Sequence, residues 1–183
     1  MSKSQTIIRG PQSFDKGQHC IYSLNSGSDF IEDLITGRAG KNYGDDYAEF
    51  VFTTPRNIKL QEHVIAYACG SIVRDDVPRI ELELLAVDQD FQRMGLGSAI
   101  ANQLISTLYA RASLPVIEVR AVDVVQGDAS NMWHSRGFKT ICGTDHMAKR
   151  ITADNIGELH NWQPRLRPDM QLAVAKHAQL IIT

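Results

Sequence analysis

The chain has 183 residues, a length typical of a single domain with its own core, and 19 Lys and Arg against 21 Asp and Glu. Its formal net charge of −2 gives no compositional support for a surface that binds a phosphate backbone, so nucleic acid is not an expected partner. The three cysteines, Cys20, Cys69 and Cys142, form no CxxC pair and favour reduced thiols over a disulfide framework or a zinc site.

Targeting signals are not recognisable in the sequence. The first ten residues contain no apolar stretch of signal-peptide length, and no run of 18 apolar residues occurs anywhere. We therefore expect a cytoplasmic protein that does not span a membrane.

The N-terminal part predicts short strands, a helix and a loop. Residues 6–8 and 21–24 are apolar and favour strands, with turn-forming residues between them. Ser28 offers an N-cap to a helix of about two turns that ends at Gly37. The polar, glycine-rich residues 38–46 then predict a surface loop.

Three strands are predicted next. Residues 47–54 and 63–73 are rich in β-branched and aromatic side chains, which favours the two strands of a hairpin. Residues 80–87 are mostly Leu, Ile and Val, and Glu81 and Glu83 would share one face of an extended strand. This third segment is therefore expected to be a central strand with a polar stripe.

A helix and a parallel strand should follow. From Gly95 to Ala112 the apolar residues recur with helical spacing. Residues 116–122 predict a strand, and a strand, helix and strand of this size form a right-handed parallel unit. A short helix over 128–136 and a last hairpin of 138–141 with 146–151 complete the predicted order.

The loop before the long helix reads Gln92-Arg93-Met94-Gly95-Leu96-Gly97. Uncapped N–H groups and the positive end of the helix dipole meet at such a helix start, which is a phosphate-binding arrangement. A Walker loop is excluded, because Ser98 and Ala99 follow Gly97 in place of Lys and Ser or Thr. The dinucleotide fingerprint fits poorly, because it requires Gly or Ala where Ile100 stands.

This hexapeptide matches the Q/RxxGxG/A signature of the GNAT N-acetyltransferases. The predicted strands and helices also follow one another in the order found in that superfamily. The chain resembles that superfamily over residues 5–151. The resemblance implies an α/β (α+β) fold: a mixed, mostly antiparallel central sheet with a splayed parallel pair and flanking helices. It divides the chain into a GNAT-like acyltransferase domain over 1–151 and a C-terminal extension over 152–183. The extension would pack on the same domain or at a subunit interface, as in a homodimer, and Asp169 would cap a helix over 170–180.

The resemblance also implies the reaction. Acetyl-CoA would be the acyl donor, and a primary amine of a small molecule or peptide would attack its thioester directly, with no metal. Backbone groups of Leu85, Ala86 and Val87 would pair with the pantetheine arm, and the Leu85 N–H would stabilise the oxyanion. The pyrophosphate would lie on the loop that comprises Gln92, Arg93, Met94, Gly95, Leu96, Gly97 and Ser98.

Two glutamates are candidate bases for the amine. Counted back from Gly95, Glu81 stands where histone-acetylating members carry their glutamate, and Glu83 could share or replace its role. Either could instead be the ion-pair partner of Arg79 or Arg120.

The predicted short helix departs from the family pattern. Many members carry an Asn near its start and a Tyr five residues before a Gly-Phe ending, and these positions hold Gln126 and Trp133. An indole only donates hydrogen bonds, so Trp133 is expected to pack against the donor rather than protonate the thiolate. Ser130, one turn earlier, is also a candidate contact of the donor. Ser130 or His134 could help to protonate the thiolate, or the thiolate could leave unassisted into water. A noncatalytic acyl-CoA-binding module and a nucleotide-binding protein therefore stay open as alternatives to the enzyme.

Overall fold

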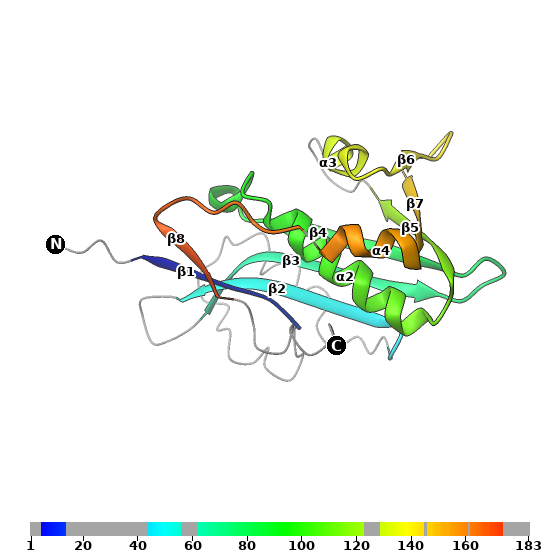
Figure 1. Cartoon of the computed structure of the whole chain (residues 1–183), viewed down its shortest axis with the longest axis horizontal. Coiled ribbons are helices and arrows are strands. Elements are labelled where there is room, and N and C mark those ends of the chain that lie inside the picture. The colour runs from blue at the N-terminus through cyan, green and yellow to red at the C-terminus, as the bar shows by residue number, and fades with distance from the viewer. Residues whose placement is uncertain are drawn as a thin grey trace.

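The structure is a computed structural model that describes residues 5–13, 44–55, 62–122, 129–144, 146–160 and 162–173. Its strands form one eight-stranded sheet in the order β6-β7-β5-β4-β3-β2-β1-β8 (Figure 1). The strands are β1 (Thr6–Ser13), β2 (Tyr47–Pro55), β3 (Glu62–Val73), β4 (Arg79–Val87), β5 (Val116–Val122), β6 (Lys139–Thr140), β7 (His146–Thr152) and β8 (Met170–Ala173). The helices are the 3-10 turn η2 (Gln89–Phe91) and α2 (Leu96–Ala112), α3 (Ala129–Ser135) and α4 (Ala153–His160).

Most of the sheet follows the predicted pairing. β2 and β3 form the expected antiparallel hairpin, and β4 runs antiparallel to β3. β4 and β5 are parallel, with α2 as their connection, and β6 and β7 form the last hairpin. The predicted mixed, mostly antiparallel sheet with a parallel pair is therefore confirmed.

The core lies between the sheet and α2. Leu96, Ile100, Leu104 and Leu108 of this helix are at most 1% exposed, and they belong to one buried cluster with the β4 side chains Ile80 and Leu82. Figure 1 shows α2 and α4 lying together across the sheet, and Leu159 of α4 belongs to the same core. A second buried cluster, on the other face, comprises Tyr47, Val51, Val64, Tyr67 and Cys69. The sheet is therefore apolar on both faces around β3 and β4.

The C-terminal prediction was wrong where the structure describes it. Residues 170–173 form the strand β8, parallel to β1, rather than the start of a helix. Met170 is buried and Leu172 half-buried while Gln171 and Ala173 are exposed, so the segment follows the two-residue period of a strand. The short α4, with Gly157 in its interior, was not predicted.

The other N-terminal predictions are only partly covered. The predicted strand at 21–24 and the helix that follows Ser28 lie outside the described residues. Among the residues that are described, no helix is long and apolar enough to cross a membrane.

Candidate functional site

The parallel pair separates at the carboxyl end of β4. Within the described residues, the register between β4 and β5 covers Arg79–Leu82 against Glu118–Ala121 and no further pairs. Beyond it, Leu85, Ala86 and Val87 pair with β3 on one side and, among the described residues, have no partner strand on the other. Backbone N–H and C=O groups along such an edge can accept an added strand or a ligand that imitates one.

A β-bulge lies just before this edge. Gly70 is opposite Leu82 and Cys69 is opposite Leu84, so Glu83 is the extra residue of β4. Gly70 is required at this point because a β-carbon there would lie 2.5 Å from the carbonyl oxygen of Glu81. After the bulge the strand presents Leu85 and Val87 to the core side, the face that Ile80 and Leu82 occupy before it.

The predicted phosphate-binding loop connects β4 to α2. Asp88 accepts a hydrogen bond from the Asp90 amide at 2.9 Å and caps η2. The chain then turns through two left-handed residues, Arg93 (φ 62°) and Gly95 (φ 79°). Arg93 is not a glycine, so this conformation is strained, as is common at binding sites.

No side chain caps the start of α2. Gly95 is the N-cap residue and makes no side-chain hydrogen bond, and the first turn contains no acidic residue. The first intrahelical bond runs from the Ala99 amide to the Gly95 carbonyl at 3.0 Å, so the amides of Leu96, Gly97 and Ser98 precede the helical ladder. Three N–H groups and the positive dipole end can therefore receive an anion.

The side chains of this loop divide by burial. Gln92 and Arg93 are exposed, whereas Met94, Leu96 and Ser98 are buried. Gln92 donates its side-chain amide to the Val87 carbonyl at 3.2 Å and so ties the loop to the end of β4. Arg93 is thus the loop side chain that can offer a charge to a phosphate.

Gly97 faces the gap beside β4. A β-carbon at this position would lie 3.3 Å from Val87 Cγ2, 3.9 Å from Met132 Sδ and 4.0 Å from Leu85 Cδ2. The space that Gly97 leaves is therefore bounded by the end of β4 and by α3. Met132 was not among the sequence candidates, since an apolar residue on a short helix carries no distinctive pattern.

The two glutamates have different partners. Glu81 accepts a hydrogen bond from Arg79 Nε at 2.7 Å and forms an ion pair with it, the alternative that the sequence left open. Glu83 accepts a hydrogen bond from the Ser71 hydroxyl at 2.9 Å. Arg120 is bound instead to Glu118 at 2.6 Å. The Ser71 hydroxyl thus binds Glu83 at the bulge, and an arginine binds Glu81 two residues earlier on the same strand.

Trp133 is buried within the core. It is 3% exposed, and its ring centroid lies 4.9 Å from that of Phe138 at an interplanar angle of 54°. Gln126 lies outside the described residues, and Ser130 belongs to α3 with its side chain undescribed. His134 is exposed at the end of the same helix.

Comparisons with known proteins agree with this arrangement. The sequence profile of the acetyltransferase (GNAT) family matches residues 25–138. The chain belongs to this family. No curated protein sequence matches it.

Solved structures of other proteins have the same fold. A variant of KacT superimposes with a TM-score of 0.56 at 13% identity, covering 85% of this chain and 99% of that one. AtaTR bound with acetyl-CoA gives a TM-score of 0.55 at 16% identity, with 86% and 99% of the two chains covered. A variant of the AtaT toxin bound to the C-terminus of the antitoxin AtaR gives a TM-score of 0.56 at 16% identity, covering 76% of this chain and 89% of that one.

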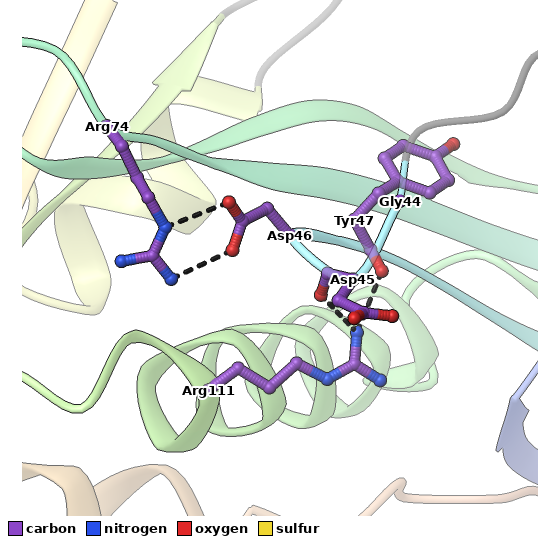
Figure 2. Close-up of a pocket in the computed structure, with 6 residues that line it drawn as sticks. All are labelled: Gly44, Asp45, Asp46, Tyr47, Arg74 and Arg111. Carbon is purple, nitrogen blue, oxygen red and sulfur yellow. Dashed lines mark hydrogen bonds and ion pairs between the residues drawn. The ribbon is translucent and has the colours of Figure 1, made fainter.

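A separate hollow of about 570 Å³ lies at the other end of α2, lined by Gly44, Asp45, Asp46, Tyr47, Arg74 and Arg111 (Figure 2). Arg74 makes two hydrogen bonds of 2.8 Å to Asp46 and lowers the pKa of that carboxyl. Arg111 donates to the Tyr47 carbonyl at 2.8 Å. A 17-residue helix rises about 25 Å, so this hollow is not part of the donor site.

Proposed function

We propose that this GNAT protein transfers an acetyl group from acetyl-CoA to a primary amine by direct attack. The observation that carries the proposal is the open backbone edge of Leu85, Ala86 and Val87 beside the uncapped start of α2. An extended pantetheine arm fits the first, and a pyrophosphate fits the second. The space left by Gly97 keeps the passage between them open.

The donor would be held mainly by backbone groups. Pantetheine amides would hydrogen-bond the free edge of β4, and the Leu85 N–H would stabilise the negative charge that develops on the thioester oxygen. The first-turn amides of α2 and the side chain of Arg93 would bind the pyrophosphate. Because these groups are fixed before the donor arrives, little reorganisation is needed at the moment of reaction.

Glu83 is the candidate base that we favour, because it lies two residues nearer than Glu81 to Leu85 and the open edge of β4. The amine nitrogen attacks the carbonyl carbon, the new C–N bond forms, the C–S bond breaks, and the amine proton passes to the carboxylate directly or through water. Glu81 lies farther from the open edge, in the part of β4 that pairs with β5, and its carboxylate is bound to Arg79. The thiolate leaves without an acid from Trp133 and takes its proton from water.

The test combines binding with turnover. A ligand that binds only the folded state raises the thermal midpoint, so acetyl-CoA should stabilise the protein while ATP and NAD should not. Release of free CoA thiol, followed with a panel of small amines and peptides, should then depend on the amine. Stabilisation by ATP or NAD but not by acetyl-CoA would contradict the proposal.

A noncatalytic acyl-CoA-binding module is the second candidate, and the burial of Trp133 at the usual tyrosine position favours it. Such a module would be stabilised by acetyl-CoA and would release no thiol with any amine. Binding and turnover measured on the same preparation therefore separate the two functions.

A further inference from the structure

Trp162 is a large exposed side chain next to the phosphate-binding loop. It is 45% exposed, and a β-carbon on Gly95 would lie 3.3 Å from its indole nitrogen. The Arg165 amide donates to the Met94 carbonyl at 2.8 Å, which fixes this segment against the loop. In Figure 1 the chain runs from α4 past the start of α2 to β8. The segment from Trp162 to Arg165 therefore borders the site proposed for the pyrophosphate.

Arg136 packs over one face of the Trp162 indole. The guanidinium carbon lies 4.9 Å from the centroid of the Trp162 ring, a cation–π contact. Arg136 also donates to the side-chain oxygen of Asn102, whose amide nitrogen donates to the Leu159 carbonyl at 2.8 Å. Burial lowers the pKa of Arg136 to about 10, so it remains a cation at neutral pH. The ring is thus oriented before any ligand binds.

One arginine covers the ring, and two others are close to it in the chain or in the loop that it touches. Arg136 lies over the ring. Arg165 follows Trp162 by three residues, and Arg93 precedes Gly95, which the indole approaches, by two. Within the part of the chain that the structure describes, no carboxylate forms an ion pair with any of these three arginines. An anionic ligand near Trp162 would therefore meet uncompensated positive charge.

We infer that Trp162 is the stacking platform for the adenine ring of coenzyme A. The inference rests on the proposed function, in which the pyrophosphate of the donor lies at the start of α2. The adenosine 3′-phosphate is the next part of the same ligand and would lie beside Trp162. A tryptophan that only anchored the segment would be expected to bury its ring, whereas much of this one is open to solvent. A purine has a flat π face that stacks on such a ring. The arginines would attract the 3′-phosphate of the ribose to which the purine is attached.

The experiment uses the whole chain and three probes: coenzyme A, 3′-dephospho-coenzyme A and S-acetylpantetheine, which lacks the nucleotide. Stacking of a base on an aromatic ring contributes about 1–3 kcal/mol to binding, so Trp162→Leu should lower the affinity for coenzyme A roughly 5- to 150-fold. The affinity for 3′-dephospho-coenzyme A should fall by a similar factor. The affinity for S-acetylpantetheine, measured by competition, should not change. Trp162→Phe keeps a ring and should retain most of the affinity. Val77→Ala, at an exposed side chain in the β3–β4 turn, is the matched control and should change nothing.

Fluorescence gives an independent signal. The chain has two tryptophans, and Trp133 is buried, so quenching by coenzyme A should disappear in Trp162→Phe. Wild-type affinity for coenzyme A in Trp162→Leu would overturn the inference. Equal losses for coenzyme A and S-acetylpantetheine would also overturn it, because they would show that Trp162 only supports the loop. A wild type that binds no acetyl-CoA would instead overturn the proposed function together with this inference.

Discussion

Replacing Gly97 by valine tests whether the donor passes between β4 and α3. A β-carbon at Gly97 would meet Val87 Cγ2 at 3.3 Å, so alanine requires a shift of a few tenths of an ångström. The two methyl groups of valine would extend further into the space bounded by Val87, Met132 and Leu85. Gly97 has ordinary helical backbone angles, so neither change strains the main chain.

The size of the effect follows from packing and helix propensity. Alanine is more favourable than glycine by at most roughly 1 kcal/mol in a helix, whereas overpacking by a larger side chain costs about 1–3 kcal/mol. Gly157 in α4 is the matched control, because nothing lies within 4 Å of its β-carbon. For a chain of this size, Gly97→Val should lower the thermal midpoint by roughly 2–12 °C relative to Gly157→Val.

Calorimetric titration of acetyl-CoA, well below the thermal midpoint, measures the functional effect. We expect Gly97→Val to bind at least about tenfold more weakly than wild type, because filling the space removes room for the pantetheine arm. Gly157→Val should bind like wild type. If Gly97→Val is destabilised yet binds acetyl-CoA with unchanged affinity, the donor does not use this passage and the reasoning fails.

Three further changes probe the base, the core and the C-terminal contact. Glu83→Gln should lower turnover more than Glu81→Gln without weakening the binding of acetyl-CoA. Measured by thiol release, the loss should shrink as the pH rises, because more of the acceptor is then already a neutral amine. A larger loss in Glu81→Gln would return the role to Glu81. Trp133→Ala should cost about 3–5 kcal/mol of unfolding free energy in urea titrations, because the ring is buried, and an unchanged midpoint would contradict that burial. Asn102→Ala should cost about 1–3 kcal/mol by leaving the Leu159 carbonyl and Arg136 unsatisfied, whereas Gln103→Ala, its half-buried neighbour, should change stability by much less in the same titration.

The long elements could be predicted because their patterns are strong. Leu96, Ile100, Leu104 and Leu108 recur with helical spacing and are buried in α2 as expected. The run of branched residues in β4 likewise needed no tertiary information. Local periodicity decides these segments because each buries a continuous face.

The rest depends on contacts between distant segments. Nothing in the letters around Glu83 marks it as a bulge, since the bulge arises from pairing with Gly70 and Cys69. Trp162 meets Gly95 only after α4 and the following segment fold back over the start of α2. Residues 170–173 were predicted as helix because their parallel partner, β1, stands at the opposite end of the sequence.

In the part of the chain that the structure describes, β4 and β5 pair through four residues each, and this short ladder divides the sheet into two blocks. Strands β8, β1, β2, β3 and β4 lie on one side of this seam, and β5, β7 and β6 lie on the other. A ladder this short can open at low cost, so amide hydrogen exchange should be faster at the seam than within the β2–β3 hairpin. A donor bound along the rest of β4 would take the place of a strand between the two blocks. The two blocks would then be held together more firmly when the donor is bound than when it is absent.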